Sequence, residues 1–377
     1  FSLGSLLCSL SPNLTFLVIA RVIQGIGGSL MTPVGKLALI KTFDKSELLK
    51  AMNFAIIPAL IGPVLGPLIG GYIVDYLSWH WIFLINLPIG ILGIVLSVKY
   101  MPNYFSKIID FDFKGFLFFA AASLLLSISL EWMGNAKNIT PVLLVFLMGF
   151  IFIYLYYRHA KKEENPIFPL ELFMVRTFRV GFLGNLATRL GISSIPLLIP
   201  LMIQIAYGQS AVVSGWIVAP MAITAMFGKS AVIKILNRFG YRKTLMFNTF
   251  LIGTLICLMA IPGINTSIYW FIPLILVLGF FNSIQLTSMN TISISDLRDS
   301  HTSSGNSLIS VNQQIAIGFG IAFGLIILKL FEGDTQLIKG NIHNAFRYTF
   351  LVMGILTIFS GFVFRRLHFR DGDNMKS

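Results

Sequence analysis

The chain is built of apolar runs, most of them about 20 residues or longer, that follow one another with short polar connections. A helix of that length crosses the hydrocarbon core of a bilayer. Because lipid cannot hydrogen-bond to the backbone, such runs are satisfied as spanning helices that pack on one another. Charged residues make up 11% of the 377 residues, against roughly a quarter in soluble domains. The sequence therefore predicts an all-α integral membrane protein.

The apolar runs predict eleven complete spans and a partial one that ends near Leu10. The complete spans cover residues 14–43, 48–77, 81–98, 111–132, 139–157, 178–205, 211–236, 244–261, 268–294, 303–331 and 345–364. Lysine and arginine concentrate in alternate loops, at residues 41–50, 99–114, 158–179, 234–243, 298 and 365–370. The only lysine or arginine residues in the intervening loops are Lys137 and Lys339. Under the positive-inside rule the basic loops and the C-terminus lie in the cytoplasm.

Several function classes do not fit this composition. The net charge of +13 comes from the basic loops, so it does not indicate nucleic-acid binding. Cys8 and Cys257 lie in apolar runs and predict neither a disulfide framework nor a metal site. The sequence has no glycine-rich phosphate loop ending in Gly-Lys-Ser/Thr, and no nucleophile, base and acid meet at membrane depth. We therefore expect neither an enzyme nor an ATP-driven pump, and no cofactor.

The arrangement of the spans indicates two halves. Six spans follow the most charged internal loop, residues 158–179, and six spans form one half of a common transporter architecture. Four spans precede Tyr100, and the two after it fit an insert between the halves. We expect an incomplete N-terminal half at residues 1–104, two inserted spans at 105–165 and a C-terminal half at 166–377. Phe1 lies within an apolar segment, so about two further helices are expected before it in the natural protein.

Residues 62–71 read Gly-Pro-Val-Leu-Gly-Pro-Leu-Ile-Gly-Gly inside one span. Glycines spaced four apart leave one helix face bare, so another helix can approach to backbone contact. Prolines in the same stretch remove backbone donors and bend the helix. A moving joint or pathway wall fits this pattern, and so does a tight structural crossing. The residues concerned are Gly62, Pro63, Gly66, Pro67, Gly70 and Gly71.

Arg21 and Arg189 fall well inside spans, where a central arginine costs roughly 2.5–3.5 kcal/mol on insertion scales. Ser193, Ser194 and Pro196 follow Arg189 and predict a weak point in its helix, where transporters place binding sites. We expect a functional role for both arginines; the alternative is a structural clamp on backbone carbonyls and amides. All fifteen acidic residues lie in loops or at helix ends. A titrating carboxylate would then lie before Phe1, or the protein does not couple to protons.

The residues from Arg21 to Gly28, Arg-Val-Ile-Gln-Gly-Ile-Gly-Gly, resemble the fourth-helix motif Arg-x-x-Gln-Gly-x-Gly of the major facilitator superfamily. Residues 62–71 resemble the fifth-helix antiporter motif of its fourteen-span drug:proton antiporter branch, with Asn53 replacing a usual glycine nine positions before Gly62. Residues 79–90 resemble the start of that branch's sixth helix, and residues 188–191 with Pro196 and Gln204 resemble the ninth helix of one exporter subgroup. Residues 237–243 look like the second copy of the family's cytoplasmic gating motif.

The resemblance implies two pseudo-symmetric six-helix halves, two inserted helices, and proton-coupled efflux of hydrophobic or cationic drugs by alternating access. It implies a monomer in the bacterial inner membrane whose partners are a small-molecule substrate, protons and lipid. The alternatives are a metabolite carrier of the same fold and a non-transporting membrane scaffold or sensor. The implied roles are the proton pathway for Arg21, Gln24 and Gly25; the hinge for the residues of the 62–71 motif; the substrate cavity for Asn53, Asn185, Arg189 and Gln204; and the cytoplasmic gate for Asn237, Arg238, Gly240, Arg242 and Lys243.

Overall fold

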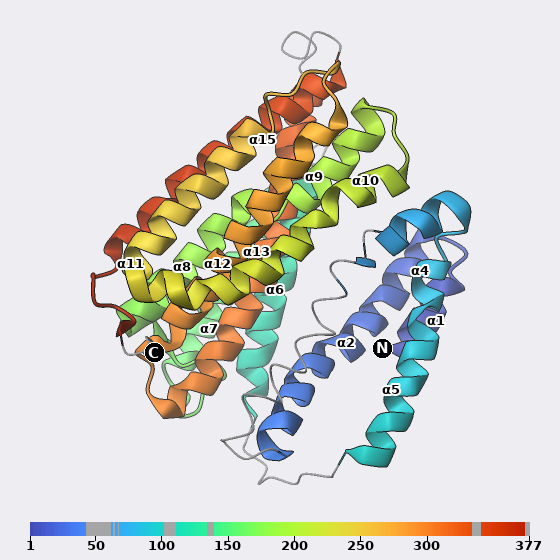
Figure 1. Cartoon of the computed structure of the whole chain (residues 1–377). Helices are drawn as coiled ribbons and strands as arrows, with labels where there is room; N and C mark the ends of the chain where they lie inside the picture. The colour runs from blue at the N-terminus through green and yellow to red at the C-terminus, as the bar shows by residue number, and fades with distance from the viewer. Residues whose placement is uncertain are drawn as a thin grey trace. The chain divides into compact units, whose positions relative to one another are not determined.

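A computed structural model describes residues 1–42, 62, 65–66, 68–101, 111–133, 139–333 and 341–373 of the chain (Figure 1). These residues form helices joined by turns, and they contain no strand. Nine helical segments in the described part are long and apolar enough to cross a membrane, which confirms the expected all-α membrane fold. They are residues 14–31, 81–100, 113–130, 140–160, 176–206, 211–258, 268–295, 304–333 and 342–366.

The chain folds into two compact units. The first unit comprises residues 1–109 and 210–219, and the second comprises residues 110–209 and 220–377. Both inserted helices expected between the halves therefore belong to the second unit. There the first of them packs against its hairpin partner and against a helix of the C-terminal half.

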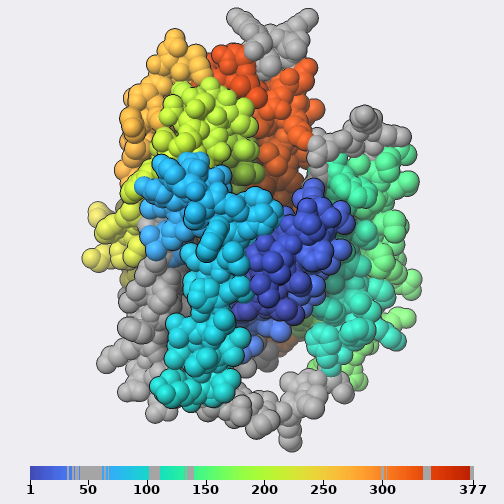
Figure 2. All heavy atoms as spheres, turned by 90° about the vertical axis from the view of Figure 1, so that its right-hand side faces the viewer, coloured from blue at the N-terminus to red at the C-terminus, as the bar shows by residue number. Residues whose placement is uncertain are grey.

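The first unit is organised around its N-terminal helix. Helix α1 packs against α2, α4 and α5, and Figure 2 shows α4 and α5 in pale blue and cyan beside the dark-blue N-terminal residues. A Cβ on Gly4 would lie 2.5 Å from the backbone of Gln24, so this crossing requires a glycine. The elements are α1 (Ser2–Ser9), α2 (Leu14–Thr42), helical residues 68–76, α4 (Trp81–Leu84), α5 (Asn86–Tyr100) and α10 (Ala211–Val218).

The second unit is a bundle in which α8 is central. Helix α8 packs against α12, α13 and α15, while α11 packs against α12 and α15, and α6 packs against α7 and α13. The helices are α6 (Phe113–Met133), α7 (Ile139–Ala160), α8 (Arg176–Ile192), α9 (Ile195–Leu201), α11 (Pro220–Leu258), α12 (Phe271–Ser295), α13 (Asp299–Gly333) and α15 (Ile342–Ser360). Shorter helical turns are η1 (Leu170–Met174), the π-helical η2 (Met202–Ala206), η3 (Ile268–Trp270) and η4 (Gly361–Arg366).

Two helix interruptions lie where the sequence predicts them. Helix α8 ends at Ile192, two serines form a turn, and α9 follows with a proline in its first turn and Pro200 inside it. Helix α11 is divided at Gly240, whose φ of 72° is a conformation that favours glycine. This glycine lies in the 237–243 motif and separates the spans expected at 211–236 and 244–261.

Candidate functional site

Arg21 and Gln24 lie together on α2, as the motif spacing predicts. Arg21 Nη1 donates to Gln24 Oε1 at 2.7 Å, and Gln24 Nε2 donates to Ser5 Oγ of α1 at 2.6 Å. Gln24 and Ser5 are buried, and the Arg21 guanidinium also lies over the ring of Phe83, 5.7 Å from its centroid. Gln24 therefore fixes the position of a membrane-embedded cation and ties it to a neighbouring helix.

The glycine motif has one close packing contact among its described residues. A Cβ on Gly71 would lie 2.8 Å from the carbonyl oxygen of Ala211 in α10, whereas a Cβ on Gly62, Gly66 or Gly70 would have no neighbour within 4 Å. One turn further on, Asp75 accepts hydrogen bonds from the first backbone N–H groups of α10, the shorter at 2.9 Å from Val212. Negative charge is favourable at a helix N-terminus. Gly71 and Asp75 therefore hold α10 through backbone contacts.

Four further predicted site residues take no part in the contacts of the first unit described above. Asn53, Pro63 and Pro67 lie outside the described residues. A Cβ on Gly25 would have no neighbour within 4 Å, so this motif glycine makes no close crossing in the described part of the first unit.

Arg189 and Asn185 form a buried polar pair on α8. Arg189 Nε donates to Asn185 Oδ1 at 2.7 Å, and the two residues are 9% and 1% exposed. Asn185 Nδ2 is buried and has no hydrogen-bond partner among the described residues. Gln204, the third predicted cavity residue of this region, lies on an exposed part of η2. Of the predicted cavity residues in this region, Arg189 and Asn185 thus form a hydrogen-bonded pair.

Among the cavities of the second unit, two of different size are lined by predicted site residues. A small one of about 10 Å³, lined by Arg189, is the size of one water molecule. A larger one of about 400 Å³ is lined mainly by apolar side chains, including Phe239, Phe247 and Phe281. Asn248 lines the larger cavity and donates at 2.8 Å to Gln285, which lines the smaller one. The hydrogen-bonded side chains of Asn248 and Gln285 therefore contribute to the lining of both cavities.

The predicted gate residues surround the Gly240 turn. Arg242 lies over the ring of Phe369, 4.6 Å from its centroid, and Lys243 lines the larger cavity. Arg238 lies 5.4 Å from the ring centroid of the adjacent Phe239. Asn237 has a partner of its own. Among the described residues, an aromatic ring thus lies against each of the two arginines.

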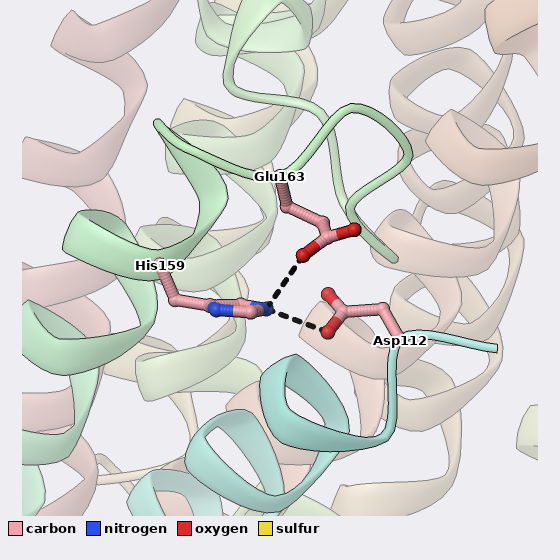
Figure 3. A group of neighbouring side chains, drawn as sticks. All are labelled: Asp112, His159 and Glu163. Atoms are coloured by element: carbon pink, nitrogen blue, oxygen red, sulfur yellow. Dashed lines mark hydrogen bonds and ion pairs between the residues drawn. The ribbon is translucent and has the colours of Figure 1, made fainter. Parts of the chain in front are cut away.

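Asp112, His159 and Glu163 form the tightest group of titratable side chains at the α6–α7 base (Figure 3). Asp112 caps α6 by accepting from Gly115 N–H at 2.8 Å, and it also accepts from Ile167 N–H at 3.4 Å. His159 Nε2 lies 2.6 Å from Asp112 Oδ1 and 3.8 Å from Glu163 Oε2. Two ligands of a tetrahedral zinc ion stand about 3.4 Å apart, so the 2.6 Å contact is a hydrogen bond rather than a prepared metal site.

The pKa of Asp112 lies below its usual value. Burial raises the pKa, but the hydrogen bonds from Gly115, His159 and Ile167 and the charge of His159 together outweigh burial. Asp112 is therefore a structural carboxylate that links α6, α7 and the segment leading to α8.

Two further polar clusters join distant parts of the second unit. Arg176 at the start of α8 binds Asp371 through Nη2 at 2.5 Å and Nε at 3.3 Å. Tyr207 donates to the carbonyl of Gly263 at 3.1 Å and lies 3.1 Å from His343 Nε2. Sequence reasoning missed both clusters, because the spacing of these residues along the chain carries no local pattern.

Comparison with known proteins identifies the family. The sequence pattern of the Major Facilitator Superfamily matches residues 1–321 and 181–376. The chain belongs to the major facilitator superfamily. The superfamily consists of membrane transporters for small molecules, which explains why polar side chains, glycine crossings and helix breaks occur inside the spans of this chain.

Relatives in this superfamily carry transport names. The chain is 40% identical to "Probable transport protein HsrA" of Haemophilus influenzae over all its residues and 81% of that protein. It is 39% identical to "Putative multidrug resistance protein MdtD" of Pectobacterium atrosepticum, over 97% of the chain and 79% of the relative. The MdtD protein of Salmonella typhimurium is also 39% identical, over the whole chain and 80% of the relative. This superfamily member is therefore a multi-pass membrane transporter.

Proposed function

We propose that this transporter exports hydrophobic compounds across a bacterial inner membrane in exchange for protons, by alternating access. The observation that carries the proposal is the Arg21–Gln24–Ser5 chain of hydrogen bonds inside the first unit. Ionisable residues inside membrane spans are costly and mark ion and substrate pathways. The names of the MdtD relatives support drug export as the direction.

Arg21 is suited to proton coupling because its guanidinium stays charged throughout the cycle. A carboxylate that approaches this cation in one conformation has a lowered proton affinity there and regains it when the two separate. Gln24 is neutral, so it positions Arg21 without neutralising it. We therefore assign Arg21 the role of the fixed charge that drives release of the coupled proton.

A hydrophobic substrate is supported by the larger cavity of the second unit. Its volume of about 400 Å³ falls in the range of small-molecule sites, and aromatic rings line it. A cationic drug, the other class that the resemblance implies, meets no carboxylate in these two cavities; Glu171 and Asp296 line a separate cavity of about 290 Å³ that contains none of the predicted site residues. We therefore propose that the transporter recognises the hydrophobic surface of its substrates rather than a positive charge on them.

The experiment uses the natural protein in proteoliposomes with an acidic interior and a panel of labelled hydrophobic drugs outside. We expect gradient-dependent accumulation for wild type and for Lys99→Ala, an exposed cation of the same unit. Arg21→Ala should lose it, and Arg21→Lys should restore part of it. Unchanged accumulation by a correctly inserted Arg21→Ala protein would refute the proposal. Gradient-driven transport of metabolites without transport of any drug would favour the metabolite carrier. Absence of transport of every solute tested would favour the membrane scaffold or sensor.

A further inference from the structure

Arg189 is a buried cation that forms no ion pair with any residue described in the structure. Its side chain is 9% exposed, and among the described residues the guanidinium has one hydrogen-bond acceptor, Asn185 Oδ1 at 2.7 Å. Buried arginines are normally paired with carboxylates or supplied with further acceptors, because an uncompensated charge in a low-dielectric interior is unfavourable. The remaining N–H groups of Arg189 have no protein acceptor among the described residues and stay available to a ligand.

Asn185 adds a second unused donor at the same place. Its Oδ1 accepts from Arg189, which fixes the orientation of the amide, and its Nδ2 is then left buried without an acceptor among the described residues. Two adjacent side chains thus present N–H groups and no free oxygen. A group of this kind is complementary to an anion.

The other residues around Arg189 provide no negative charge. The polar lining of the small cavity consists of hydroxyls and amides, and Gln285 already bonds to Asn248 and to Thr249 at 2.8 Å each. The acidic residues of the whole sequence lie in loops or at helix ends. Among the described residues of its own bundle Arg189 thus has no anionic partner, and a bound anion would supply one.

We propose that Arg189 and Asn185 bind the carboxylate of an acidic, hydrophobic small molecule. The guanidinium of Arg189 and Nδ2 of Asn185 supply N–H donors to the carboxylate oxygen that enters the cavity. The cavity, of about 10 Å³, admits one water-sized group, such as a carboxylate oxygen. The apolar part of the lining includes Ile192, Leu286 and Met289, and the proposal places the apolar body of the ligand outside the cavity, next to this surface. As a statement about substrates, this assignment rests on the proposed transport function.

The test compares two probes with the same ring system and opposite charge, 1-naphthoate and 1-naphthylmethylammonium. Binding to the purified natural protein in detergent is measured by calorimetry at neutral pH, where both probes are charged. Wild type should bind naphthoate about ten-fold more tightly than the ammonium probe or better, because a buried Arg–carboxylate pair has no equivalent for the cation. Arg189→Gln should lose that preference.

Two further variants make the result specific. Asn185→Asp keeps the size of the side chain and places a carboxylate beside the guanidinium, so it should remove naphthoate binding while leaving Arg189 in place. Arg179→Gln removes an exposed arginine from the same helix and should change neither affinity by more than about two-fold. Asn185→Asp also serves as the decisive variant if Arg189→Gln does not fold.

Three results would overturn the assignment: no naphthoate binding by wild type, no preference for it over the ammonium probe, or a preference that survives in both Arg189→Gln and Asn185→Asp. The last result identifies Arg189 as a structural clamp only. Because binding is measured without a gradient, these outcomes are separate from the transport test. Loss of gradient-driven transport with the naphthoate preference intact would reject the proposed function and leave the site.

Discussion

Replacing Asp112 by alanine should loosen the base of the α6–α7 hairpin. The substitution removes the cap of α6, worth about 1 kcal/mol. It also takes the acceptor away from Ile167 N–H and from His159, and a buried donor left without an acceptor costs about 1–3 kcal/mol. The Asp112 side chain is 3% exposed, so water does not replace these bonds freely. The expected loss of local stability is about 2–4 kcal/mol.

Amide hydrogen exchange measures this loss locally. Exchange in the first turn of α6 and at residue 167 should accelerate from about 30-fold to several hundred-fold, since 1.4 kcal/mol corresponds to a factor of ten. Glu163→Ala is the matched control, because its carboxylate is 44% exposed and 3.8 Å from His159, and exposed pairs contribute about 0–1 kcal/mol. Equal effects of the two substitutions, or unchanged exchange in Asp112→Ala, would refute the reasoning.

The pH dependence gives a second check on the same bonds. The folded-state pKa of Asp112 lies below its ordinary value, so its stabilising contribution is complete above the ordinary pKa of about 4. The contribution is lost as the pH falls through the lowered folded-state pKa. Protection of α6 that depends on Asp112 should therefore be constant between neutral and mildly acidic pH. A decline near neutral pH would show that another group controls the hairpin.

Three further predictions concern packing, an aromatic cluster and topology. Gly320→Val should destabilise the α8–α13 crossing by about 1–3 kcal/mol, because the new side chain would clash with the backbone carbonyl of Arg189. Gly318→Val is the control, because a side chain at this position meets open space and should leave stability unchanged. Thermal denaturation in detergent distinguishes the two variants. Tyr207→Phe should lower stability by about 1 kcal/mol for the lost bond to Gly263, measured in the same assay, and an unchanged midpoint would contradict the assignment. A cysteine replacing Arg242, with Cys8 and Cys257 replaced by serine, should react with a membrane-impermeant maleimide only from the cytoplasmic side.

The spans could be predicted from sequence because their signal is local. Each run carries its own apolar length, and the interruptions at Ser193 and Gly240 also lie in the residues that make them. The Arg21–Gln24 contact is predictable for the same reason, since residues three apart share a helix face. Local periodicity is thus sufficient where the partner lies on the same helix.

The contacts between helices were not predictable in the same way. Asp112 meets His159 across 47 residues, and Arg176 meets Asp371 across 195. Gly320 and Gly324 of α13 permit close approach to Arg189 of α8 and to Ser194 of the α8–α9 turn, yet one sequence does not show which helix a bare face will meet. Such partners are determined by the packing of the whole bundle.

Arg21 and Arg189 follow one structural rule in separate units. Each guanidinium is held by a side-chain amide from its own helix, Gln24 in one case and Asn185 in the other. A carboxylate at those positions would hold the arginine equally well but would neutralise it, and any ligand would then have to displace a strong ion pair. A neutral amide orients the cation and leaves its charge available, which is the preorganisation that binding an anion or releasing a proton requires. Under the two proposals made above, it is the neutral amide partner that keeps the charge of each arginine available inside the membrane.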